Sequence, residues 1–310
     1  MKTGFVFPGQ ASQYVGMGKE FIEMYSECKE IVKKGEKITN LPLREKIMNG
    51  PMEELTRTLI CQPAVFCISL VCWTAFRKNS DLVPDFVAGH SLGEYTALVV
   101  SGVINLEEGF YIVKRRAQIM DEISQKVNGT LLAVIGMKIG ELEKVIKNFE
   151  GVEISNINSY SQIIVGGEKE KLIEFSKFLK GRGVKTIFLK VTGPFHTSFM
   201  KPAGQLLEEE ITKIDFKNPE IPVFLNYSGN LARDKEEVKE GLVKQLYSPV
   251  KWLDIIKNME KENVEIFVEV GPKKVLKKLI ESILPDKKVF NVEDKNSLEE
   301  TLNYLGGKNV

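Results

Sequence analysis

Strand-like and helix-like segments alternate along almost the whole chain, and this rhythm restricts the possible folds more than any other feature. Parallel strands need a long crossover between them, which a helix usually supplies. The alternation therefore predicts an α/β fold with a mostly parallel sheet. We expect strands at 3–7, 85–89, 222–226 and 266–270, and helices at 17–37, 63–78, 236–246, 250–261 and 273–284, with a further helix that begins at Asn105 in a capping box.

The rhythm changes between residues 128 and 192. There we expect strands at 131–135, 152–157, 163–166 and 184–189, with helices at 140–149 and 169–179. The order βαββαβ is typical of the ferredoxin-like unit. We therefore predict an inserted small subdomain at 128–192, and a large α/β subdomain formed by residues 1–127 and 193–310.

Charge and composition exclude several classes of protein. The 43 Lys and Arg residues nearly balance the 42 Asp and Glu residues, so no overall field favours nucleic acid or an anionic membrane. The apolar run at 63–76 is too short to span a bilayer and predicts a core helix. Four cysteines without an export signal predict reduced thiols and a cytoplasmic protein. Because their spacing does not suit zinc and only two histidines are present, we expect no metal site.

The segment Gly89-His90-Ser91-Leu92-Gly93 fits the pattern Gly-x-Ser-x-Gly between an expected strand and an expected helix. A sharp strand-to-helix turn needs small flanking residues, because a Cβ atom there would collide with the returning chain. Such a turn presents the serine hydroxyl at the positive end of the helix. It predicts a nucleophilic Ser91 in an α/β-hydrolase-like subdomain, although a turn with an inert serine fits the same five letters.

A nucleophilic serine needs a base, and the chain contains only two histidines. His90 adjoins Ser91 on a tight turn, where its side chain would project away from the hydroxyl, so we expect it in the core beneath the turn. His196 follows a stiff Gly-Pro-Phe approach in the loop after the small subdomain. Elimination leaves His196 as the predicted base.

Arg116 interrupts an apolar face of the expected helix that begins at Asn105. An unpaired buried charge costs several kcal/mol, roughly, so this arginine needs a partner. Either an Asp or Glu in the core or the carboxylate of a substrate would fit, and the face analysis alone slightly favours the first. Two glutamines are further candidates for the site. Gln10 lies at the carboxyl end of the first strand, and Gln62 precedes Pro63 at an expected helix start. Either residue could instead be only a turn or capping residue.

Taken together, these residues resemble the malonyl-CoA:acyl carrier protein transacylases and the acyltransferase domains of polyketide synthases. The likeness covers nearly the whole chain, and eight motifs in the same order make it specific. They are Phe7-Pro8-Gly9-Gln10-Ala11-Ser12-Gln13, Gln62-Pro63-Ala64, Gly89-His90-Ser91-Leu92-Gly93-Glu94-Tyr95, Arg116 with Met120, Asn156-Ile157-Asn158-Ser159, Gly193-Pro194-Phe195-His196, Gln245 to Trp252, and Glu269-Val270-Gly271-Pro272.

The resemblance implies a ping-pong transfer of a malonyl group from coenzyme A, through an acyl-serine at Ser91, to the phosphopantetheine thiol of acyl carrier protein. His196 would be the base, oriented by the main-chain carbonyl of Gln245. The N–H of Leu92 and the backbone of Gln10 would form the oxyanion hole. Arg116 would hold the malonyl carboxylate, which reverses the preference stated above. No cofactor is implied, because coenzyme A and the carrier are substrates.

The same resemblance implies that Gln62, Asn158 and Phe195 contact the substrate, with the Phe195 ring favouring malonyl over methylmalonyl groups. Two departures affect the expected shape of the site. Ala11 stands where the family usually has glycine, and residues 117–121 differ from the usual stretch after the arginine. The chain is expected to be a monomer. An expected helix carries four lysines, at 273, 274, 277 and 278, which form a candidate surface for an acidic carrier protein.

Three alternatives remain open on the sequence. A serine esterase or thioesterase of the α/β-hydrolase type would place an acid between the serine and a histidine near the C-terminus, whereas more than a hundred residues follow His196. A polyketide acyltransferase that acts in trans would share every motif. A catalytically silent subunit that binds the carrier protein would not need Ser91.

Overall fold

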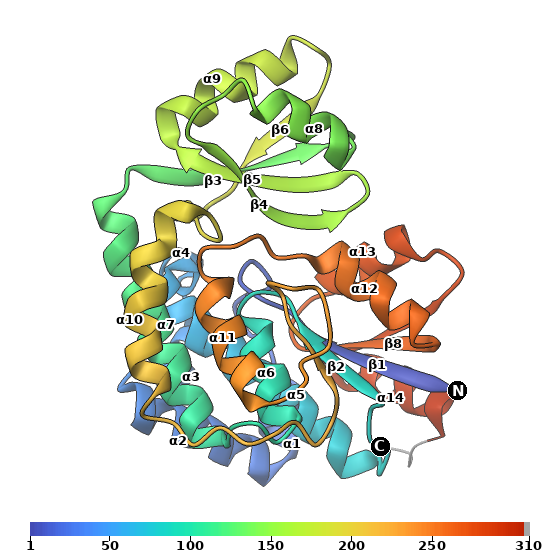
Figure 1. Ribbon diagram of the computed structural model, residues 1–310. Helices are drawn as coiled ribbons and strands as arrows, with labels where there is room; N and C mark the ends of the chain where they lie inside the picture. Colours follow the sequence, from blue (N-terminus) through green and yellow to red (C-terminus); the bar gives the residue numbers. More distant parts are fainter. Residues whose placement is uncertain (307–310) are drawn as a thin grey trace.

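The computed structural model describes residues 1–306, which form a large lobe and a small lobe (Figure 1). The large lobe contains a five-stranded sheet in which every pair of neighbours is parallel, as the alternation of segments predicts. The strands run in the order β7-β2-β1-β8-β9. Their bounds are β1 Lys2–Phe7, β2 Phe86–Gly89, β7 Val223–Phe224, β8 Val264–Val270 and β9 Lys288–Val292.

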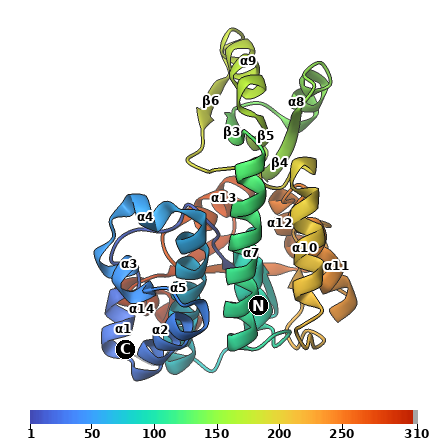
Figure 2. The same cartoon turned by 90° about the vertical axis from the view of Figure 1, so that its left-hand side faces the viewer.

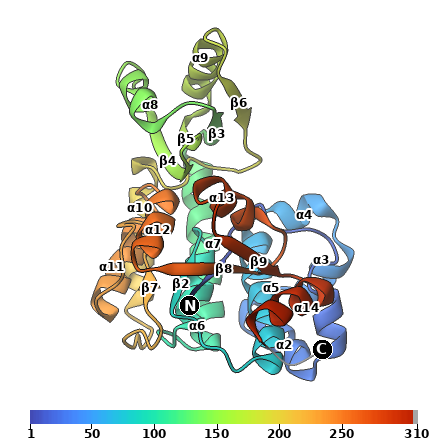
Figure 3. The same ribbon diagram turned by 90° about the vertical axis from the view of Figure 1, so that its right-hand side faces the viewer.

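Helices cover both faces of this sheet (Figures 1 and 3). Alternate side chains of β1 point to opposite faces: Phe5 and Phe7 join the larger core cluster, and Val6 joins a second cluster with α12 and α13. The large-lobe helices are α1 Lys19–Met24, α2 Ser26–Thr39, α3 Leu43–Asn49, α4 Met52–Thr56, α5 Thr58–Asn79, α6 Gly93–Val100, α7 Leu106–Lys126, the short 3₁₀ helix η1 Ser198–Met200, α10 Lys201–Ile211, α11 Lys235–Gln245, α12 Trp252–Lys261, α13 Val275–Ile283 and α14 Lys295–Leu305.

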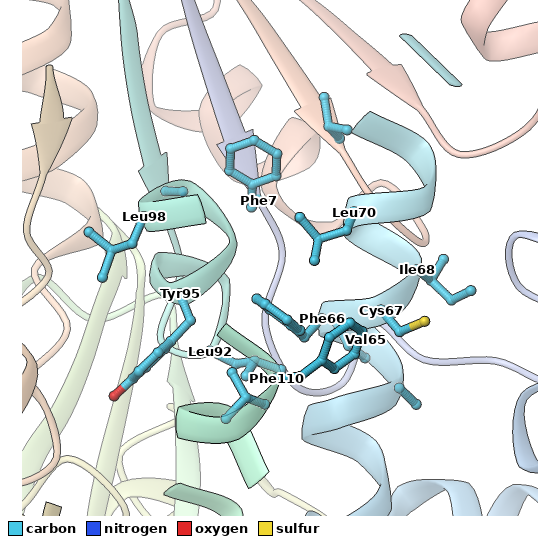
Figure 4. Packing of buried hydrophobic residues seen from close by; sticks show 14 of the residues in the cluster. Phe7, Val65, Phe66, Cys67, Ile68, Leu70, Leu92, Tyr95, Leu98 and Phe110 are labelled. Atoms are coloured by element: carbon cyan, nitrogen blue, oxygen red, sulfur yellow. The ribbon is translucent and has the colours of Figure 1, made fainter. Parts of the chain in front are cut away.

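Large apolar side chains fill the space between β1, α5, α6 and α7 (Figure 4). Phe66 of α5 meets Phe110 of α7 edge-to-face, with 5.0 Å between the ring centroids. Helix α5 is long and apolar enough to cross a membrane, but most of its apolar stretch is buried inside the lobe. It is therefore the core helix that the sequence predicts, and it gives α7 a firm surface to pack against.

The small lobe has the element order β-α-β-β-α-β and a four-stranded antiparallel sheet, β4-β5-β3-β6. Leu132 and Val134 of β3 point toward the two helices, whereas Leu131 and Ala133 point toward the large lobe. Figure 2 shows the helices on the side away from the large lobe. The elements are β3 Gly129–Ile135, α8 Ile139–Ile146, β4 Val152–Ser159, β5 Gln162–Glu168, α9 Lys169–Lys180 and β6 Lys185–Phe188.

Three of the differences between the expected and the observed helix boundaries have a clear physical cause. The helix expected at 17–37 is divided at Tyr25, whose backbone is extended and whose hydroxyl accepts a hydrogen bond from Asn79. Helix α5 begins five residues before Pro63, so Gln62 lies inside the helix; Pro63 removes only one backbone hydrogen bond close to the helix start. Helix α13 begins at Val275 rather than at 273, because Lys273 has a left-handed backbone with φ of 64°.

Candidate active site

A cavity of about 560 Å³ lies between the two lobes. Its large-lobe side is formed where parallel strands end, since Gln10 follows β1 and His90 and Ser91 follow β2. The carboxyl edge of a parallel sheet is the usual place for a site in α/β proteins. Residues of the small-lobe sheet that face the cavity include Leu131, Ala133, Ile135, Ile164 and Ile187.

Ser91 lies on a strained turn between β2 and α6, with φ of 52°. The two flanking glycines are required by close backbone approaches: a Cβ atom on Gly89 would lie 1.9 Å from the carbonyl carbon of Gly93, and one on Gly93 would lie 1.9 Å from the carbonyl oxygen of Phe7. No side chain fits at either position. The Gly-x-Ser-x-Gly pattern thus has the steric cause that the sequence analysis assigned to it.

His196 is brought against Ser91 from a distant part of the chain. Its Nε2 atom lies 2.8 Å from Ser91 Oγ, and its Nδ1 atom lies 2.7 Å from the main-chain oxygen of Gln245. The imidazole is buried, and burial together with the nearby positive charge of Arg116 lowers its pKa to about 3. The ring is therefore neutral near pH 7, with Nδ1–H donating to Gln245 and Nε2 free to accept the serine proton.

Arg116 is almost completely buried, with 1% of its surface exposed, and it points at the same serine. One terminal nitrogen donates to Gln62 Oε1 at 2.7 Å, and the other donates to Gln245 Oε1 at 2.9 Å and to Ser91 Oγ at 3.1 Å. Throughout residues 1–306, no carboxylate forms an ion pair with this guanidinium. The hydrogen-bond partners of the guanidinium are therefore neutral, and the buried Glu94 acts on its charge without an ion pair.

The other predicted substrate contacts also line the cavity. Asn158 Oδ1 lies 2.9 Å from His90 Nε2, and the His90 ring packs edge-on against Trp252. His90 therefore points away from Ser91, as expected for the residue before the nucleophile. Gln62 lies on the second turn of α5 and reaches Arg116, while the buried Phe195 ring lies beside the histidine.

The two expected oxyanion donors lie close to the serine turn. Leu92 is the last residue before α6, where backbone N–H groups have no partner within the helix. Gly9, next to Gln10, packs so closely on the turn that a Cβ atom there would lie 2.4 Å from the His90 oxygen and 3.6 Å from Leu92 N. Ala11 has φ of 82°, a left-handed conformation that glycine adopts without strain, which agrees with the glycine that the sequence resemblance implies for this position.

Two residues that hold the turn were missed by the sequence analysis. Asn226 follows β7, accepts from the Ser91 N–H at 2.6 Å and donates to the Gly89 oxygen at 2.6 Å. Glu94, on the first turn of α6, accepts from the Asn226 N–H and from Gln245 Nε2, both at 3.0 Å. The signal for Asn226 was present, because a polar residue at the carboxyl end of a strand beside β2 reaches the site edge.

Backbone strain is concentrated at the cavity. Six non-glycine residues of the described chain have positive φ, and four of them line this cavity: Ala11, Ser91, His196 and Lys273. Such conformations persist where the surrounding structure enforces them, and they cluster at functional sites. No group of three His, Cys, Asp or Glu side chains that could hold a metal ion is found between residues 1 and 306.

Comparisons with known proteins identify the family of this site. Residues 4–298 match the acyl transferase domain family. The malonyl CoA-acyl carrier protein transacylase of Bacillus subtilis is 36% identical, over 99% of this chain and 98% of that protein. The crystal structure of malonyl CoA-acyl carrier protein transacylase from Clostridium perfringens is also 36% identical, with a TM-score of 0.93, covering 99% of this chain and 98% of that one.

A second similar structure contains a malonyl-transacylase in complex with the acyl carrier protein of a type II polyketide synthase. It is 30% identical, covers 98% of this chain and all of the other, and has a TM-score of 0.94. The chain belongs to the acyl transferase family. The resemblance drawn from the eight sequence motifs is thereby confirmed.

Proposed function

We propose that this protein transfers a malonyl group from malonyl-CoA to the phosphopantetheine thiol of acyl carrier protein, for fatty acid synthesis. The observation that carries the proposal is the joint approach of His196 and Arg116 to Ser91 Oγ, at 2.8 Å and 3.1 Å. The first residue supplies a base for the serine. The second supplies a buried positive charge with which no carboxylate of the described chain forms an ion pair.

In the first half-reaction, His196 Nε2 takes the Ser91 proton as the hydroxyl oxygen attacks the thioester carbonyl. The Leu92 N–H and the Gln10 backbone stabilise the resulting oxyanion. The tetrahedral intermediate then expels the coenzyme A sulfur, which receives the proton from His196, and malonyl-Ser91 remains. The Gln245 carbonyl keeps His196 in the tautomer that this step needs, and no triad carboxylate is required.

Arg116 changes partner during this step. In the free enzyme it donates to Ser91 Oγ, and its charge adds to the effect of burial in lowering the pKa of His196. The malonyl carboxylate would accept hydrogen bonds from both terminal nitrogens of Arg116 and neutralise the charge of the guanidinium. This raises the basicity of His196. Binding of a carboxylated acyl group therefore strengthens the base, whereas an acetyl group leaves it weak.

In the second half-reaction, the thiol of the carrier's pantetheine arm attacks the malonyl-serine, and His196 takes the thiol proton. The tetrahedral intermediate then expels Ser91 Oγ, which receives that proton from His196, so malonyl-carrier is released and the enzyme is regenerated. Gln62 and Asn158 contact the acyl group, and the Phe195 ring crowds an α-methyl group. One methyl group gives about 1–3 kcal/mol of discrimination, so malonyl is preferred over methylmalonyl. The chemistry needs no cofactor beyond these two substrates.

The carrier protein would dock beside the cavity mouth. Lys273 lines the cavity, and Lys274 and Lys278 are exposed nearby. The four lysines do not share one helix as expected, because Lys273 and Lys274 precede α13 and only Lys277 and Lys278 lie on it. They still present positive charge to an acidic partner. We place the protein in the cytoplasm as a monomer.

The lobes support a two-subdomain description, with an α/β-hydrolase-like part at 1–127 and 193–310 and a ferredoxin-like insertion at 128–192. The strand order β4-β5-β3-β6 and its antiparallel pairing support the second assignment. In this description the insertion supplies one wall of the cavity and the large subdomain supplies the reacting groups.

The decisive experiment incubates the protein with malonyl-CoA, with and without holo acyl carrier protein. We expect intact-mass spectrometry to show a malonyl adduct on the wild type, none on Ser91→Ala, and malonyl-carrier only when the carrier is present. Free malonate without malonyl-carrier would indicate an esterase or thioesterase instead. Absence of the adduct from both proteins would favour a silent subunit, and transfer only to a polyketide carrier would favour the polyketide pathway.

A further inference from the structure

Glu94 is a buried carboxylate to which the mechanism above gives no role. It lies on the first turn of α6, three residues after Ser91, and none of its surface is exposed. Its Oε2 atom accepts hydrogen bonds from the Asn226 N–H and from Gln245 Nε2, both at 3.0 Å, while Oε1 has no partner. A fully buried carboxyl group with such specific contacts requires an explanation.

The contacts of Gln245 indicate what Glu94 does. A glutamine amide has a donor end and an acceptor end, so its orientation decides which neighbours it can satisfy. Here Nε2 donates to Glu94 Oε2 and to the Ser91 main-chain oxygen, both at 3.0 Å. Oε1 is thereby turned toward Arg116, whose terminal nitrogen donates to it at 2.9 Å.

The opposite orientation of this amide would fail at all three contacts. Its NH₂ group would face the guanidinium, which carries only donors, and its oxygen would face two acceptors. In a site closed to water, each of these groups would be left without a partner. Glu94 and the Ser91 oxygen together therefore select the orientation in which Gln245 can hold Arg116.

We propose that Glu94 is a positioning residue that orients the Gln245 side chain, so that Arg116 is aimed at the acyl group on Ser91. The inference rests on the proposed roles of Ser91 and Arg116. In this interpretation, the glutamate that follows the Gly-x-Ser-x-Gly turn helps the enzyme to select a carboxylated acyl group. Glu94 touches neither substrate nor reacting atoms. It acts on Arg116 through Gln245, and its second hydrogen bond, from the Asn226 N–H, supports the serine turn.

The test compares three variants. Glu94→Leu removes the acceptor, and Glu94→Gln retains an amide oxygen that can accept the same two hydrogen bonds. Thr96→Val is the matched control, because Thr96 is a buried polar residue of the same helix whose hydroxyl has no partner. Single-turnover acylation of Ser91 is measured by intact mass, once with malonyl-CoA and once with acetyl-CoA.

We expect Glu94→Leu to slow malonylation about 10- to 100-fold, the range for a lost hydrogen bond to a charged group, and to slow acetylation less than about 5-fold. Glu94→Gln should restore the preference for malonyl over acetyl, and Thr96→Val should leave both rates unchanged. Gln245→Leu combined with Glu94→Leu should cost no more selectivity than Gln245→Leu alone, because both changes remove the same contact.

Equal loss of both acylation rates in Glu94→Leu would overturn the proposal, since that result means general damage to the serine turn. A Glu94→Gln variant no better than Glu94→Leu would overturn it as well, and so would additive losses in the double variant. These outcomes differ from failure of the proposed function, in which the wild type itself forms no malonyl-Ser91.

Discussion

The two walls of the cavity differ in chemistry. The large-lobe wall carries a buried polar network in which Ser91, Arg116 and Gln245 are joined by direct hydrogen bonds. The small-lobe wall is mainly an apolar sheet face, formed by side chains such as Leu131, Ala133 and Ile164. Under the proposed function, the difference implies a division of work: one lobe performs the reaction, and the other covers the reacting groups and keeps water from the acyl-serine.

The largest expected effect that would test this division lies on the polar wall. Arg116→Ala should reduce malonyl acylation of Ser91 at least about 100-fold, because a buried charged hydrogen-bond partner of the carboxylate is lost. Acetyl acylation should be retained or should rise, because removing the positive charge takes away one of the two causes, after burial, that lower the pKa of His196. Acylation rates with the two coenzyme A esters provide the measurement, and an equal loss of both would make Arg116 a structural residue.

A second prediction concerns the stability cost of the polar wall. Burial raises the pKa of Glu94 from 4.5 to about 7, so the folded protein retains a proton that the unfolded chain releases between these values. The contribution of Glu94 to unfolding free energy therefore falls as pH rises across this window. In Glu94→Gln this decline is absent. Between pH 4.5 and pH 7.5, the unfolding free energy of the variant should therefore rise by about 3 kcal/mol relative to that of the wild type.

Chemical denaturation of both proteins across this pH range measures that difference. The Thr96→Val variant is the control, because it adds no titrating group. A stability difference between Glu94→Gln and the wild type that does not change with pH would show that Glu94 ionises normally in the folded state.

The smallest effect is expected on the apolar wall. Ile187 lines the cavity from β6 and is 45% exposed, so Ile187→Ser should change stability by less than about 0.5 kcal/mol. We expect KM for malonyl-CoA and for acetyl-CoA to rise together by about 2- to 5-fold with little change in kcat. A selective effect on one acyl group would contradict the division between the two walls.

The sequence predicted the parts of the molecule that depend on local pattern. The parallel sheet, the capping box at Asn105 and the glycine-flanked serine turn each follow from residues close together in the chain. The approach of His196 to Ser91 was reached by elimination between two histidines, and the partners of Arg116 could not be decided from its helix face. Those partners lie 54 and 129 residues away, where spacing carries no information.

The wrong helix boundaries at Tyr25 and α13 and the site residues that were not predicted all involve contacts between separate segments of the chain. At the break at Tyr25, the tyrosine hydroxyl accepts a hydrogen bond from the distant Asn79. At the late start of α13, which follows the left-handed Lys273, Glu269 accepts from the N–H groups of Leu276 and Lys277. Glu94 and Asn226 were missed because each acts on the serine turn through contacts between distant segments. Local propensity describes none of these contacts.

The four left-handed residues at the cavity have a consequence for the evolution of the protein. Each holds a backbone conformation that costs about 1–2 kcal/mol for a residue other than glycine, which is a large share of the net stability of an ordinary domain. Ser91 and His196 are two of the four. Selection for thermal stability alone would favour glycine at these positions, because glycine relieves the backbone strain. Under the proposed function, variants with glycine at Ser91 or His196 would be more stable but would have no acyltransferase activity.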